Sequence, residues 1–190
     1  MIQHERIEAL FASLDDIKGA PKDEGRVELI VIRPVTNARR VLEECHLSLA
    51  GGMEGDNWAK GCWKTLEDGR PHPDVQVALM NARCIRAIAG DPENWPAAGD
   101  SLFVDLDLSE ANLPVGTQLA IGNAVLQITE VAHTACAKFS ERYGEDAFRF
   151  TRDPECAGLN LRGIYARVVK DGVVKTGDVI RKCQPDLGLG

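Results

Sequence analysis

The apolar positions follow two different periods along the chain, and the change from one to the other falls near residue 25. Five apolar residues before that point fall on one face of a helix: Ile7, Leu10, Phe11, Leu14 and Ile17. The sequence Gly19, Ala20, Pro21 ends this pattern, because proline does not continue a helix. We therefore predict an N-terminal amphipathic helix.

Seven short runs after this point are rich in β-branched residues, which favour strands. The runs span residues 27–34, 75–80, 102–106, 118–121, 124–131, 164–170 and 179–181. Helical patterns occupy only 81–89 and 138–150, and Gly144 breaks the second. Because these helices are too few to alternate with the strands as βαβ units do, the pattern predicts a mainly β protein. We expect a closed or partly closed β-barrel with a few peripheral helices and the N-terminal amphipathic helix.

Two dipeptides predict tight turns between strands. Gly122-Asn123 and Asp171-Gly172 both suit the positive φ angles that two-residue hairpin turns require. We therefore predict a hairpin at each of them.

Composition and charge exclude several classes of protein. The 190 residues are 44% hydrophobic and 27% charged, which is typical of one globular domain with a core. The 22 basic and 29 acidic residues give a net charge of -7, which disfavours nucleic-acid binding. The longest apolar stretches fall short of the roughly 20 residues that a membrane-spanning helix requires, and no secretory signal is visible. We expect a cytoplasmic protein with neither nucleic acid nor membrane as a partner.

Six cysteines are present, and only one stands in a chemically distinctive sequence. In a cytoplasmic protein we expect reduced thiols, and their spacing matches no zinc signature. Cys136 lies where a predicted strand has ended and a helix begins, with His133 and Lys138 close in sequence. This setting favours a thiolate, the form that attacks sulfur or ligates a metal. The alternative is that Cys136 is a small buried residue and His133 a surface loop residue.

Two further segments suit an anionic ligand. Residues 51–56 form a glycine-rich turn, whose backbone N–H groups suit phosphate oxygens; the alternative is a tight loop in which Asp56 caps its own backbone. The segment 160–167 contains Asn160 and places Arg162 at the entry to a strand. The planar guanidinium of an arginine suits a phosphate, and the alternative there is a surface salt bridge.

Six motifs, in this order along the chain, together resemble the MOSC domain, the module found at the C-terminus of molybdenum-cofactor sulfurases and as free-standing bacterial proteins. They are residues 52–56 (GMEGD), 99–102 (GDSL), 113–122 (LPVGTQLAIG), 133–139 (HTACAKF), 161–169 (LRGIYARVV) and 177–180 (GDVI). The resemblance implies a barrel like the pyruvate-kinase β-barrel domain. It places a MOSC domain at 26–183. The N-terminal amphipathic helix and its connection at 1–25 lie outside the resemblance, and we expect a C-terminal tail at 184–190.

The resemblance further implies that the chain binds the molybdenum cofactor (molybdopterin). It makes Cys136 the catalytic residue, as a metal ligand or a persulfide carrier, and we assign His133 as its catalytic neighbour. The cofactor-binding positions would then be Gly52, Gly55, Asp56, Lys138, Asn160 and Arg162. Among these, the phosphate of the pterin would contact Arg162, Lys138 or the amides of the glycine turn.

Three functions remain open at this point. In the first, Cys136 ligates molybdenum and the site reduces a small N-hydroxylated substrate. Electrons then come from a separate protein, because no flavin, iron-sulfur or haem motif is present. In the second, Cys136 carries sulfane sulfur from a donor protein to a metal-sulfur centre; in the third, the chain is a non-catalytic cofactor-binding module. The N-terminal helix either docks a partner or a second subunit, or covers one end of the barrel.

Overall fold

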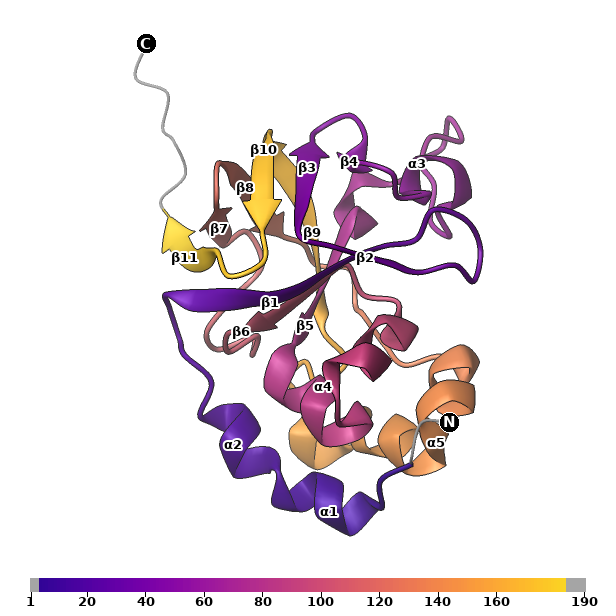
Figure 1. Cartoon of the computed structure of the whole chain (residues 1–190), viewed down its shortest axis with the longest axis vertical. Helices are drawn as coiled ribbons and strands as arrows, with labels where there is room; N and C mark the ends of the chain where they lie inside the picture. The colour runs from indigo at the N-terminus through magenta and orange to yellow at the C-terminus, as the bar shows by residue number, and fades with distance from the viewer. Residues whose placement is uncertain (1–3, 184–190) are drawn as a thin grey trace.

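The computed structural model describes residues 4–183, in which seven strands close into a barrel (Figure 1). They are β1 (Gly25–Ile32), β5 (Val77–Asn81), β6 (Leu102–Asp105), β7 (Gln118–Ile121), β8 (Ala124–Ile128), β9 (Ile164–Lys170) and β11 (Val179–Cys183). Their order is β11-β7-β8-β9-β5-β6-β1, and β11 pairs back onto β1 to close the barrel. Within the barrel, β5 and β6 run parallel and the other pairs run antiparallel. Each of the seven β-branched runs forms one of these strands, so the predicted β-barrel is confirmed.

The other strands lie outside the closed barrel. The strand β2 (Arg40–Leu42) pairs with β1. The strands β3 (Glu44–Ser48), β4 (Gly52–Met53) and β10 (Gly172–Lys175) form a small separate sheet in the order β10-β3-β4.

One of the two predicted hairpins is correct. Gly122, with a φ of 54°, turns the chain between β7 and β8. The hairpin predicted at Asp171-Gly172 is wrong, because β9 already pairs with β5 on one edge and β8 on the other. The strand β10 therefore finds its partner in β3.

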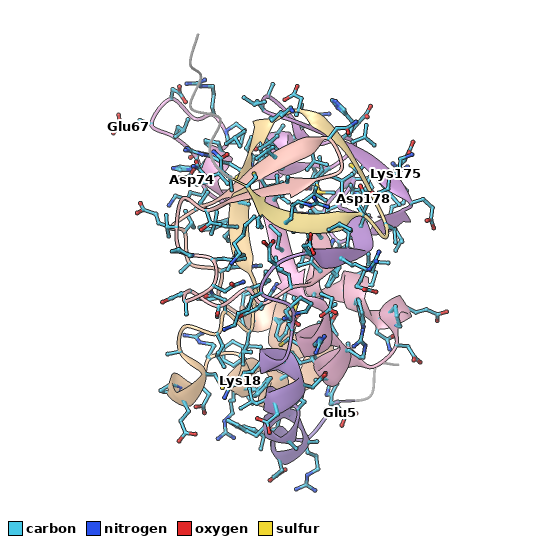
Figure 2. The ribbon with its side chains drawn as sticks, turned by 90° about the vertical axis from the view of Figure 1, so that its left-hand side faces the viewer. Glu5, Lys18, Glu67, Asp74, Lys175 and Asp178 are labelled. Atoms are coloured by element: carbon cyan, nitrogen blue, oxygen red, sulfur yellow. The ribbon has the colours of Figure 1, made fainter. Side chains whose placement is uncertain are left out.

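The helices gather mainly below one end of the barrel (Figure 1). This layer contains α1 (Ile7–Ala12), α2 (Leu14–Lys18), α4 (Ala82–Ala89) and α5 (Ala137–Phe150). The loops contain the short helix α3 (Trp58–Gly61) and the 3₁₀ turns η1 (Pro73–Val75), η2 (Pro92–Ala98) and η3 (Pro154–Cys156). Figure 2 shows Lys18 and Glu5 at the helical end, with Glu67, Asp74 and Lys175 at the barrel end. The predicted N-terminal helix divides at Ser13 into two, and α5 is kinked at Gly144, where φ is 89°.

The barrel strands separate two apolar cores. Ile30 and Ile32 of β1 belong to the core inside the barrel, whereas Val31 between them packs among the helices. This alternation follows from the two-residue period of a strand. The apolar face of the N-terminal helices enters the second core, in which Leu10 and Ile17 are buried and Phe11 packs edge-on against Phe150.

Within residues 4–183, none of the helices is both long and apolar enough to span a membrane. The tail predicted at 184–190, like residues 1–3, lies outside the described residues.

Candidate functional site

A buried carboxylate, Asp100, lies at the centre of the candidate site, in the loop between η2 and β6. Nη1 of Arg162 lies 2.9 and 2.6 Å from its two oxygens, while Nη2 donates to the carbonyl of Ala98 at 3.0 Å. Burial raises the pKa of the Asp100 carboxyl, and the positive charge of Arg162 acts in the opposite direction. This ion pair fastens the loop before β6 to the start of β9.

His133 lies against the same carboxylate. Its Nδ1 is 3.5 Å from Oδ1 of Asp100, and its ring packs on that of Tyr165 with centroids 4.2 Å apart. The side chain is 8% exposed, and Nδ1 has no hydrogen-bond partner. Burial, together with the positive charges of Arg162 and Arg33, holds the pKa of His133 well below its usual value. The imidazole is therefore neutral at pH 7.

This lowered pKa predicts a dependence of stability on pH. Between the lowered pKa and about 6.5, the unfolded chain binds a proton at His133 that the folded chain does not bind. The free energy of unfolding therefore decreases as the pH is lowered through that window, by up to about 1.4 kcal/mol per pH unit from this group. His133→Gln removes the titration, so wild type should lose stability relative to the variant as pH falls from 7 to 5. Urea denaturation at several pH values measures this, and a difference that stays constant with pH would contradict it.

Three more arginines surround the loop that carries Asp100. Nη1 of Arg33, just beyond β1, donates to the carbonyl of Gly99 at 3.4 Å. Arg39, in the loop between β1 and β2, donates through Nε to the carbonyl of Pro96 at 3.1 Å. Arg142, in α5, donates through Nη1 to the carbonyl of Ala97 at 2.7 Å. These contacts bring three guanidinium groups from distant parts of the sequence to one loop.

The charges in this group do not balance. Asp56 faces Arg33, with Nε to Oδ2 at 3.0 Å and Nη2 to Oδ1 at 3.1 Å. Burial, and then the positive charges of Arg142 and Arg33, lower the pKa of Arg39. Three guanidinium groups around one loop, with Asp56 paired to one of them, create a place suited to an anion such as phosphate.

Cys136 is the exposed cysteine among the six, all of which are free. It directly precedes α5, and its carbonyl accepts the N–H groups of Phe139 and Ser140. The ring of Phe139 in turn lies 4.8 Å from the guanidinium carbon of Arg162, so Cys136 begins the helix that packs on the buried ion pair. The alternative of a buried Cys136 and a surface His133 is wrong on both counts, because the cysteine is exposed and the histidine side chain is buried.

Other thiols are in environments that suppress reactivity. Burial raises the pKa of Cys45 to about 11 and that of Cys84 to about 12. Both side chains are therefore protonated at neutral pH. A protonated thiol, unlike a thiolate, is a poor nucleophile and a poor metal ligand.

The glycine turn contributes to the site through one residue. Asp56 accepts the N–H of Trp58 at 2.8 Å, as the capping alternative expects, and it also holds Arg33. Gly52 has a structural reason to be glycine, since a Cβ there would lie 2.9 Å from the side chain of Gln76. Gly55 is exposed, and a Cβ on it would lie 3.0 Å from Ile32 and 3.4 Å from Arg40.

Two other predicted residues lie at the margin of the site. Lys138 is exposed on the first turn of α5, two residues from Cys136. Asn160 donates through Nδ2 to the carbonyl of Leu108 at 2.8 Å and has a φ of 51°, so it shapes the loop that leads to Arg162. The structure thus brings His133, Arg162 and the start of α5 together, and connects Asp56 to them through Arg33.

The sequence interpretation missed four charged residues of the site: Arg33, Arg39, Asp100 and Arg142. Asp100 does lie in the motif 99–102, but that motif suggested no role for its carboxylate. The three arginines lie in no motif, and only the folded chain brings them to the loop before β6.

No group of three or more His, Cys, Asp or Glu side chains within residues 4–183 has an arrangement suited to holding a metal ion.

Comparisons with known proteins agree with the barrel. The family model described as the MOSC domain matches residues 72–181. The YuaD protein of Bacillus subtilis has a similar crystal structure, with a TM-score of 0.61 and 19% identity over 84% of this chain and 97% of that one. YiiM from Escherichia coli has a TM-score of 0.55 and 18% identity over 84% of this chain and 70% of that one. YiiM from Geobacillus stearothermophilus has a TM-score of 0.52 and 13% identity over 86% and 77%. A search of curated proteins found no match.

Proposed function

Because this chain belongs to the MOSC domain family, which is associated with the molybdenum cofactor, we propose that it binds that cofactor with Cys136 as the metal ligand. The proposed reaction is the reduction of small N-hydroxylated substrates, with electrons supplied by a separate protein. The observation that carries this proposal is the exposed thiol at the start of α5, the helix whose Phe139 packs on Arg162 and whose Arg142 donates to the loop before β6. When bound, the cofactor would supply redox chemistry at its metal.

The residues of the site fit such a group. A single soft thiolate suits molybdenum when a pterin supplies the other ligands. Buried Nδ1 of His133 and Nε of Arg162 also lack hydrogen-bond partners within the protein. Unpartnered buried polar atoms are costly, which supports a ligand in their neighbourhood.

We assign the phosphate of the cofactor to Arg33, Arg39 and Arg142. Arg162 is a weaker candidate than the sequence suggested, because Asp100 already compensates its charge. Arg39 is half-buried among like charges, and an anion there would offset the repulsion. Lys138 is free to approach the same ligand from the first turn of α5.

His133 is proposed to orient the substrate. Tyr165 and Asp100 fix the position of its ring. A neutral imidazole has one acceptor nitrogen, which suits the hydrogen of an N–OH group.

Metal and sulfane-sulfur analysis tests the proposal. The full chain is expressed in a host that makes the cofactor, together with Cys136→Ala and, as a control, Cys62→Ala. Cys62 is a partly exposed thiol in the loop after α3. We expect about one molybdenum per chain in wild type and the control, and none in Cys136→Ala. Molybdenum retained in Cys136→Ala would contradict the ligand assignment and favour a non-catalytic binding module.

The same experiment tests the second candidate function, in which Cys136 carries sulfur. The exposure of Cys136 supports this candidate, because a donor protein could reach the thiol. Labile sulfur on Cys136 without molybdenum would support the carrier and contradict the reductase.

A further inference from the structure

A short segment over residues 62–72, which we call the flap, joins α3 to η1 at the barrel end. Figure 2 shows Glu67 at its projecting tip. Within this described segment no residue is buried. A segment without buried side chains opens at a low free-energy cost, so the position of the flap depends on few contacts.

The flap is held together by its own hydrogen bonds. The N–H of Leu66 donates to the carbonyl of Arg70 at 2.8 Å, and the N–H of His72 donates to the carbonyl of Lys64 at 2.9 Å. The hydrogen bonds of the described residues 64–71 stay within the flap. The flap can therefore move as one unit about its two ends.

The side chain of Trp63 connects the flap to the barrel. Its ring lies 6.4 Å from that of Tyr165 in β9, measured between centroids, at an angle of 42°. Burial raises the pKa of Tyr165 and a hydrogen bond from Trp63 acts in the opposite direction, so the indole N–H reaches the phenol. Trp63 is nevertheless 67% exposed. Core packing does not explain so exposed a tryptophan, and its contact with Tyr165 is the link that holds the flap down.

Tyr165 in turn supports His133. The two rings have centroids 4.2 Å apart and an interplanar angle of 34°. Nδ1 of His133 lies 3.5 Å from Oδ1 of Asp100 and has no hydrogen-bond partner. Because no hydrogen bond fixes the imidazole at Nδ1, its orientation depends on packing against Tyr165. A chain of contacts therefore runs from the exposed flap to the buried centre of the site.

We propose that Trp63 is a positioning residue, which latches the flap onto Tyr165 and thereby holds the ring of His133 in its observed orientation. When the latch opens, Tyr165 loses one of its two aromatic neighbours, and both Tyr165 and His133 gain freedom to rotate. The latch itself is a property of the chain without cofactor. Its consequence, that the flap controls how a substrate is oriented, rests on the function proposed above for His133.

NMR spectroscopy of the full chain without cofactor tests the latch. The sequence has two tyrosines, so labelling with 3-fluorotyrosine gives two fluorine signals, and the fully buried Tyr143 is an internal reference. Trp63→Ala should move the Tyr165 signal and increase its solvent isotope shift, while the Tyr143 signal stays in place. The open fraction of the flap should rise by about 3- to 10-fold, the effect of losing one aromatic pair.

The imidazole signals of His133 test whether the latch reaches the site. The sequence has four histidines, and His133→Gln identifies the signals that belong to His133. Trp63→Ala should shift these signals and leave the urea midpoint almost unchanged, because the flap contributes no buried residue. Trp63→Phe keeps a ring against Tyr165 and should restore most of the wild-type shifts of both Tyr165 and His133.

Glu67→Ala is the matched control, because Glu67 lies on the same flap and is exposed. It should leave the signals of Tyr165 and His133 unchanged. The proposal is overturned if the His133 signals of Trp63→Ala match those of wild type, or if Glu67→Ala shifts them as much. A urea midpoint of Trp63→Ala as low as that of a core substitution would also overturn it, since Trp63 would then act on the whole fold. Because no cofactor is present, these outcomes are independent of those that test the proposed function.

Discussion

Arg162→Met should lower the free energy of unfolding by about 3–5 kcal/mol. The guanidinium is the partner of a fully buried carboxylate, with Nη1 2.6 Å from Oδ2 of Asp100. Its removal would leave that charge without compensation in the protein interior, which costs far more than the net value of the pair. The loss should appear as a lower urea midpoint at pH 7.

Two controls separate this effect from a general loss of packing. Combining Arg162→Met with Asp100→Leu removes both charges and should recover much of the stability, because buried ion pairs replaced together are often neutral. Arg70→Met breaks an exposed pair with Asp68 and should leave the midpoint almost unchanged. If Arg162→Met has the same urea midpoint as Arg70→Met, the buried charge of Asp100 does not need Arg162 for its compensation, and the prediction is wrong.

Gly163→Ala should destabilise the protein by about 3 kcal/mol or more. Gly163 has a φ of 100°, and a Cβ there would lie 2.2 Å from the carbonyl oxygen of Leu79. Leu79 pairs with Ile164 between β5 and β9, so the barrel itself must shift to admit a methyl group. The same methyl would lie 3.3 Å from Nδ1 of His133, and the site would shift with it.

Gly177→Ala provides a matched control, since its φ is 87° but a Cβ would meet nothing within 4 Å. That variant should lose only about 1 kcal/mol, the cost of the backbone conformation. Equal losses in the two variants would show that the approach of Leu79 to Gly163 is not limiting. Urea denaturation of both proteins measures the difference.

The barrel was predictable because each of its strands has a dense apolar pattern of its own. Residues such as Ile30 and Ile32 bury on one face and Val31 on the other, so these strands read as continuous hydrophobic runs. The strands β2, β3, β4 and β10 were missed. β2, β4 and β10 have only two to four residues, which are too few to show a period, and β3 has only Cys45 and Leu47 as apolar residues. The false hairpin at Asp171-Gly172 arose because local turn chemistry contains no information on which strand edge is free.

The site was predictable only in part, for a different physical reason. Cys136 and Arg162 lie in local motifs, and their neighbours in sequence suggested their chemistry. Arg39 and Arg142 donate hydrogen bonds to a loop that lies more than forty residues away from each of them in the sequence. Their place in the site therefore depends on tertiary contacts alone. The lowered pKa of His133 also depends on burial by the fold, which no local pattern encodes.

The most direct test of the central claim is X-ray absorption at the molybdenum edge for wild type and Cys136→Ser, both loaded with cofactor. Serine keeps the size of the side chain but replaces the soft sulfur with oxygen. The proposed ligation predicts that the variant loses one sulfur neighbour of the metal and gains an oxygen or nitrogen in its place. An unchanged sulfur shell in Cys136→Ser would show that Cys136 is not the ligand.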